Sequence, residues 1–106
     1  MNTVQKGSVR CIIFKNEEDN SWYGVALEFN IIESGDDPDV VRFNLDEAIQ
    51  GYVESQNKIK GSRVAPLNQK PISEYEELWN NLNSAKPIPS PYYVKYYGVS
   101  NVLNNA

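Results

Sequence analysis

Histidine is absent from this chain of 106 residues, and cysteine occurs only once. Without histidine, neither Ser-His-Asp and Cys-His catalytic sites nor histidine-based metal sites can form. The single cysteine, Cys11, excludes a disulfide within the chain, and its apolar surroundings, V-R-C-I-I-F, indicate a buried, unreactive thiol. The sequence also has no Walker-type or dinucleotide-binding glycine pattern. We therefore expect no enzyme activity, no cofactor and no metal ion. An acid–base enzyme stays an alternative that would need carboxylates with shifted pKa values in a lined pocket.

Positive charge is also scarce, because ten basic residues stand against fourteen acidic ones and the net charge is −4. Nucleic-acid affinity depends on basic side chains that neutralise phosphates, so direct nucleic-acid binding is not expected. A nucleic-acid-binding regulator stays an alternative if its basic residues converge in space: Arg10, Lys58, Lys60, Arg63 and Lys95. An acidic protein suits a basic protein partner, which its electric field attracts.

No signal peptide, long apolar span or lipidation signal is visible in the sequence. We therefore expect a cytoplasmic protein that does not contact a membrane. The length predicts a single domain over residues 1–106.

Three strands are predicted in the first third of the chain. V-R-C-I-I-F-K, residues 9–15, is apolar on both faces, which indicates a central strand that is covered on each side. A polar turn joins it to W-Y-G-V-A-L-E-F, residues 22–29, and the two should form a hairpin. Asn30 indicates a kink before a third short strand at residues 31–34.

A long helix over residues 38–60 follows. Asp37 is the expected N-cap and Pro38 the first helical residue, and Asp36 and Asp39 also suit the positive end of the helix dipole. Metal binding by these acids is the alternative to capping. The apolar positions recur every three or four residues and predict one buried stripe, formed by Val41, Leu45, Ala48, Ile49 and Tyr52.

The rest of the chain predicts a connector, a short second helix over residues 72–83, a proline-rich lead and a last strand over residues 92–97. Ser73 and Glu76 match a capping box. The second helix has an apolar stripe that includes Trp79 and that packs either on its own sheet or on a partner. The last strand is rich in tyrosine on both faces. Packing in the core or at a protein interface is favoured over base stacking, since only Lys95 is basic nearby.

These elements predict an α+β fold, in which a three- to four-stranded, mainly antiparallel sheet in the order β-β-β-α-…-β carries one long helix. The second helix would cover the other face of the sheet or join two subunits. The domain divides into a core unit at 8–58, a connector with the second helix at 59–85, and the proline-rich lead with the last strand at 86–99.

The strands, the segment A-L-E-F-N-I-I-E-S-G-D and the helix centre L-D-E-A-I-Q-G-Y-V-E-S resemble the N-terminal domain of HicB-family antitoxins. The resemblance covers residues 8–58 and, more weakly, 86–99. Two features depart from that family: E-F-N-I-I stands where P-x-L-P-G-C is usual, and the sequence lacks an evident helix-turn-helix or ribbon-helix-helix DNA-binding domain.

The resemblance implies a β-β-β-α unit with a partial RNase H-like fold that binds a small basic toxin and masks its ribonuclease site. Charge complementarity would assist such docking. The candidate partner-binding residues are Asp46, Glu47 and Glu54, on the polar side of the long helix. A stand-alone dimeric protein is the alternative, and in this homo-oligomer Trp79, Tyr93 and Tyr97 are the candidates for self-association.

Overall fold

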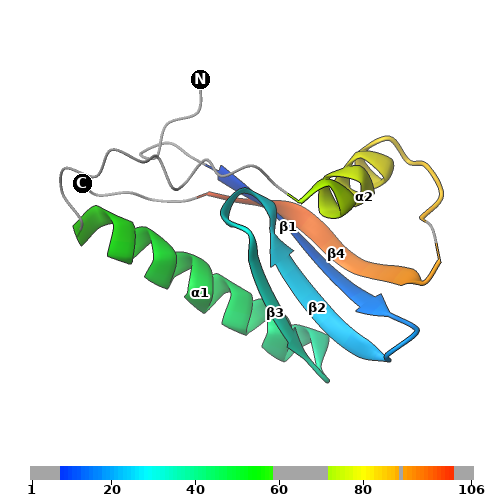
Figure 1. Ribbon diagram of the computed structural model, residues 1–106, viewed down its shortest axis with the longest axis horizontal. Helices are drawn as coiled ribbons and strands as arrows, with labels where there is room; N and C mark the ends of the chain where they lie inside the picture. Colours follow the sequence, from blue (N-terminus) through cyan, green and yellow to red (C-terminus); the bar gives the residue numbers. More distant parts are fainter. Residues whose placement is uncertain (1–7, 59–71, 89, 102–106) are drawn as a thin grey trace.

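The computed structural model describes residues 8–58, 72–88 and 90–101 of the chain. These residues form an α+β fold with a four-stranded antiparallel sheet in the order β3-β2-β1-β4 and a helix on each face (Figure 1). The elements in chain order are β1 (Ser8–Asn16), β2 (Ser21–Ala26), η1 (Leu27–Phe29), β3 (Ile31–Gly35), α1 (Pro38–Lys58), α2 (Ser73–Asn83) and β4 (Tyr92–Asn101).

The central position predicted for the first strand is confirmed, since β1 pairs with β2 on one side and with β4 on the other. Its side chains alternate between two cores. Val9, Cys11 and Ile13 lie in the core under α1, whereas Ile12 and Phe14 lie in the core under α2. All five are buried because a helix covers each face of the sheet.

The start of α1 follows the sequence prediction closely. Pro38 is the first helical residue, and one carboxylate oxygen of Asp37 accepts hydrogen bonds from the amides of Asp39 and Val40, at 2.8 and 3.4 Å. Val41 and Leu45 of the predicted stripe are buried against the sheet. The predicted end of this helix at residue 60 lies outside the described residues.

α1 packs closely over Gly24 of β2. A Cβ atom at this position would lie 3.0 Å from Ile13 Cδ1 and 3.0 Å from Val41 Cγ1. Such contacts are tighter than ordinary packing, so the absence of a side chain at residue 24 permits the spacing between helix and sheet.

The second predicted strand is too long by three residues. Pairing with β1 stops at Ala26, and Leu27–Phe29 form a 3-10 turn that ends at Asn30 in the left-handed conformation, with φ 56°. The turn sends Leu27 into the core under α2 and Phe29 into the core under α1. The kink predicted at Asn30 is confirmed, and asparagine is among the residues that tolerate this conformation.

The second helix packs on its own sheet, as one of the two sequence interpretations proposed. Leu78 is fully buried, and Tyr75, Trp79 and Leu82 pack around the same core. The predicted capping box is wrong. Ile72 is the N-cap residue, and its apolar side chain cannot make a capping bond; the Glu76 carboxylate binds the Arg10 guanidinium through two 2.8 Å hydrogen bonds. The bidentate pair with arginine gives Glu76 two charge-assisted hydrogen bonds, whereas a backbone amide would give it one.

Candidate functional site

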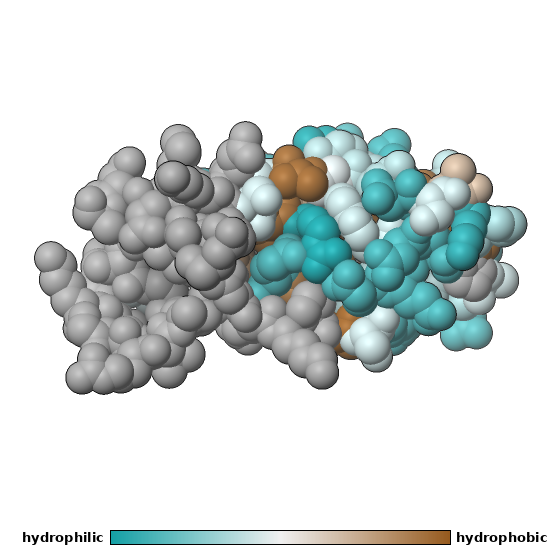
Figure 2. Space-filling model, turned by 90° about the horizontal axis from the view of Figure 1, so that it is seen from above, coloured by the Kyte–Doolittle hydropathy of each residue, from teal (hydrophilic) through white to brown (hydrophobic). Residues whose placement is uncertain are grey.

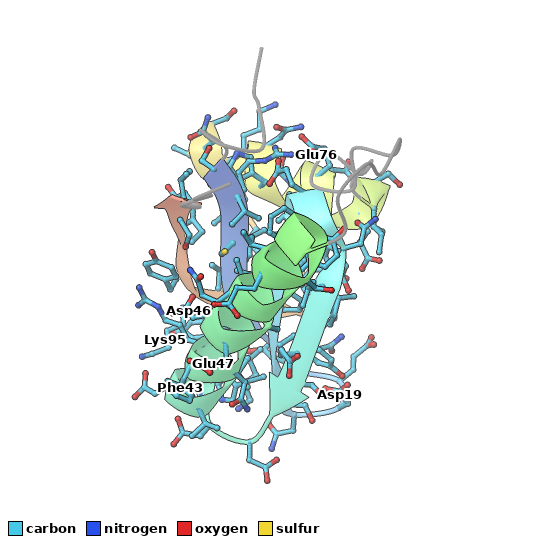
Figure 3. All side chains as sticks on the ribbon, turned by 90° about the vertical axis from the view of Figure 1, so that its left-hand side faces the viewer. Asp19, Phe43, Asp46, Glu47, Glu76 and Lys95 are labelled. Atoms are coloured by element: carbon cyan, nitrogen blue, oxygen red, sulfur yellow. The ribbon has the colours of Figure 1, made fainter. Side chains whose placement is uncertain are left out.

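The candidate site combines the exposed side of α1 with the edge strand β4, which the contact between Arg42 and Tyr96 connects. We call it the α1–β4 surface, and its residues are Val40, Phe43, Asp46, Glu47, Tyr93 and Lys95. Phe43 is 63% exposed, more than any other large hydrophobic residue that the structure describes. Figure 3 shows Phe43, Asp46 and Glu47 along α1, with Lys95 beside them in the same view.

Arg42 connects the helix to the edge strand at this surface. Its guanidinium carbon lies 3.8 Å from the centre of the Tyr96 ring, which is a cation–π contact. Asp46 lies one helical turn beyond Arg42, so the two side chains lie on the same flank of α1. The contact ties the first half of α1 to β4, while the body of the helix packs on β2 and β3.

The three acids that the sequence indicated for partner binding are all exposed on α1. Asp46 and Glu47 belong to the α1–β4 surface, next to the exposed ring of Phe43. Glu54 lies seven residues beyond Glu47, which corresponds to roughly 10 Å along the same side of the helix. Phe43 and Val40 were missed by the sequence reasoning, although the signal was present: both are apolar and lie off the predicted buried stripe.

The three residues proposed for self-association do not form one patch. Trp79 and Tyr97 contact each other on the α2 face, with ring centres 5.5 Å apart. Tyr93 contacts Trp22 on the α1 face, with ring centres 6.2 Å apart. An uninterrupted strand would place Tyr93 and Tyr97 on one face, but β4 has an irregularity between the partners of Ile13 and Phe14, where Lys95 is the extra residue.

The basic residues that a nucleic-acid interface would need are only partly described. Lys60 and Arg63 lie outside the described residues, as does the side chain of Lys58. Arg10 forms ion pairs with Glu28 and Glu76, at 2.5 and 2.8 Å. A guanidinium that is bound by two carboxylates adds little positive potential to the surface, which lowers the support for the nucleic-acid alternative.

Cys11 has the environment of a structural thiol. It is 4% exposed, and burial raises its pKa to about 11. Its sulfur lies 3.8 Å from the Ser100 hydroxyl and 3.9 Å from the Val9 carbonyl oxygen. A thiol with so high a pKa remains protonated at neutral pH and is a poor nucleophile, as the sequence predicted for a buried cysteine.

Two further observations concern metals and membranes. The described part of the chain contains no group of three or more acidic or cysteine side chains that could hold a metal ion. Within the same residues, neither helix is both long and apolar enough to cross a membrane. The face seen from above in Figure 2 is mainly hydrophilic in its described part, with small hydrophobic areas between the polar residues.

Comparison with protein-family models, with curated proteins and with solved structures found no match to this chain. The similarity to HicB antitoxins therefore stays a prediction from the residues.

Proposed function

We propose that this chain is a non-catalytic protein-binding domain that binds a small basic protein through the α1–β4 surface. The observation that carries the proposal is the exposed ring of Phe43 next to the exposed carboxylates of Asp46 and Glu47 on one helix. Interfaces commonly combine an aromatic anchor at the centre with a charged rim. A net charge of −4 favours a basic partner, because complementary charge speeds and orients docking.

The finer form of the proposal is a HicB-like antitoxin whose partner is a small ribonuclease toxin. The order of elements, with three antiparallel strands, a long helix and a later strand, agrees with the β-β-β-α unit that the resemblance implies. In this form, the α1–β4 surface binds the toxin and masks its ribonuclease site. The domain then acts by occupying a site, with no chemistry of its own.

The first test is recovery of the partner. The tagged protein is purified from its own host after nuclease treatment, and the bound proteins are identified by mass spectrometry. We expect one small basic protein in a stoichiometric amount, released by high salt because charged contacts are screened. The purified partner should cleave RNA, and added domain should inhibit the cleavage. A partner without ribonuclease activity would refute the antitoxin form alone.

Variants of surface residues then test whether the partner binds at the α1–β4 surface. Phe43→Ala should weaken binding by about tenfold or more, as expected for an aromatic anchor. The double variant Asp46→Lys, Glu47→Lys should slow association by roughly tenfold at low salt. Glu77→Lys on α2 is a matched control for a lysine replacing an exposed acid, and it should leave binding unchanged. Equal binding by all variants would place the partner elsewhere, and recovery of the bait alone would favour the stand-alone, self-associating alternative.

A further inference from the structure

On the face opposite α1, four aromatic rings line a hollow of about 180 Å³. We call it the aromatic hollow; it is formed by the ends of three strands and the first turn of α2, and its lining residues are Phe14, Asn16, Tyr23, Glu74, Tyr75 and Tyr92. It shares no residue with the α1–β4 surface. An inference from it therefore does not depend on the proposed function.

Phe14 is the centre around which the other rings are arranged. The ring centres of Tyr92, Tyr23 and Tyr75 lie 5.2, 5.6 and 6.0 Å from that of Phe14. Phe14 is itself buried, whereas Tyr23, Tyr75 and Tyr92 are half-exposed. A group that enters the hollow therefore meets the tyrosine rings of β2, β4 and α2, which are packed around Phe14.

Two carboxylates accompany the rings. The Tyr92 hydroxyl donates a hydrogen bond to Glu74, and the Tyr23 hydroxyl donates one to Asp19 in the β1–β2 turn. Among the described residues that line the hollow, none is basic. The hollow is therefore bounded by aromatic rings, tyrosine hydroxyl groups and carboxylate charge, a combination that favours cations over anions.

The aromatic lining indicates which cation fits best. Glu74 and Asp19 each accept a hydrogen bond from a tyrosine hydroxyl, which keeps their negative charge beside the rings. A primary ammonium would lose hydration that these groups only partly replace. An ammonium covered by methyl groups needs no acceptor and gains from contact with aromatic rings, as quaternary ammonium ligands do in aromatic cages.

We propose that the aromatic hollow binds a methylated ammonium group. The same chemistry is present in small quaternary amines and in the side chain of trimethylated lysine. The rings and the carboxylate charge recognise the cationic head, while the remainder of the ligand extends into solvent or along the neighbouring hollow, which shares Glu74 and Tyr92 and also includes Glu77.

The test is a titration of the full chain followed by amide chemical shifts. Choline is compared with 3,3-dimethylbutan-1-ol, a neutral molecule of the same shape, and a trimethyl-lysine peptide is compared with its unmodified form. We expect saturable shifts around Phe14, with choline at least about fivefold tighter than the alcohol. Tighter binding of the methylated peptide than of choline would identify a protein ligand, and the reverse order would identify a small molecule.

Two variants and one control assign the binding to the hollow. Glu74→Gln removes the charge but keeps an acceptor for the Tyr92 hydroxyl, and it should weaken choline binding by roughly threefold without changing the affinity for the alcohol. Tyr75→Leu should weaken choline binding by about fivefold. Tyr93→Leu, which changes an exposed tyrosine on the other face, should have no effect. Equal affinity for choline and the alcohol, or no saturable shift with any methylated ammonium at high millimolar concentration, would overturn the proposal.

Discussion

The ion pairs of Arg10 join three parts of the fold, and their contribution to stability can be predicted. The guanidinium binds Glu76 on α2 through two hydrogen bonds of 2.8 Å, and its Nε lies 2.5 Å from a carboxylate oxygen of Glu28 on the 3-10 turn. It also lies over the Trp79 ring, at 5.7 Å from the ring centre. Breaking these contacts should loosen the attachment of α2 to the sheet.

The magnitude follows from the geometry and the exposure of the pair. Exposed ion pairs contribute about 0.2–1 kcal/mol, whereas breaking a buried pair costs about 3–5 kcal/mol. The side chains of Arg10 and Glu76 are 23% and 37% exposed, so solvent screens the pair considerably. The two parallel hydrogen bonds strengthen it. We therefore expect a coupling free energy of about 1 kcal/mol between Arg10 and Glu76.

The assay is a double-mutant cycle in urea, with Arg10→Met, Glu76→Gln and the double variant. Unfolding is followed by tryptophan fluorescence at neutral pH. The cycle removes the part of the Arg10→Met effect that comes from lost packing on Trp79, because this loss occurs with and without Glu76. Glu77→Gln, a neighbouring and exposed position on α2, is the control for removal of a negative charge.

The pH dependence supplies a second, independent readout. The hydrogen bonds from Arg10 lower the pKa of Glu76 below its ordinary value of 4.5. The stabilisation is therefore fully present above about pH 4.5 and is lost as pH falls through the lowered pKa of the folded state. The difference in unfolding free energy between the wild type and Glu76→Gln should shrink in that range. A coupling energy below about 0.3 kcal/mol, or a difference that stays constant in acid, would refute the reasoning.

Two further predictions concern the packing of α1 and of β1. Gly24→Ala should destabilise the fold by about 1 kcal/mol or more in urea, because its Cβ meets Ile13 and Val41 at 3.0 Å. Gly51→Ala should stabilise it by up to about 1 kcal/mol, because nothing lies within 4 Å of that Cβ and alanine favours a helix; the same sign for both would contradict this packing. Cys11 should react with a thiol reagent at pH 8 only as fast as the protein opens, because the thiol is buried and its pKa is raised to about 11. Fast labelling of the folded protein would show that the thiol is accessible.

The parts of the fold that depend on neighbouring residues in the sequence were predictable. Asp37 caps α1 because its carboxylate reaches amides only two and three residues away. The strand β1 is central because both of its faces are apolar, which is a property of that segment alone. Local signals, such as a capping residue and the pattern of apolar residues within one segment, therefore predicted the elements and the fold class.

The failures occurred where a distant residue decides the outcome. Ser73 and Glu76 match a local capping motif, but Glu76 binds Arg10, which is 66 positions away along the chain. The bulge in β4 is a second example, because its place depends on the pairing with β1. Only part of the candidate site was predictable, because distant residues also shape it. The pattern of the helix indicated the exposed acids, whereas their position relative to β4 depends on tertiary contacts such as that between Arg42 and Tyr96.

The bulge in β4 also bears on how the proposed partner would bind the α1–β4 surface. In the sheet of the described residues β4 is an edge strand, and an edge strand offers backbone groups to which a partner can add another strand. However, a bulge and an exposed lysine are two features that discourage such pairing, and Lys95 combines them. Binding through side chains is therefore favoured over strand addition. In that mode Phe43 would supply the apolar contact and Asp46 and Glu47 the charge, so affinity should depend on salt far more than backbone pairing would require.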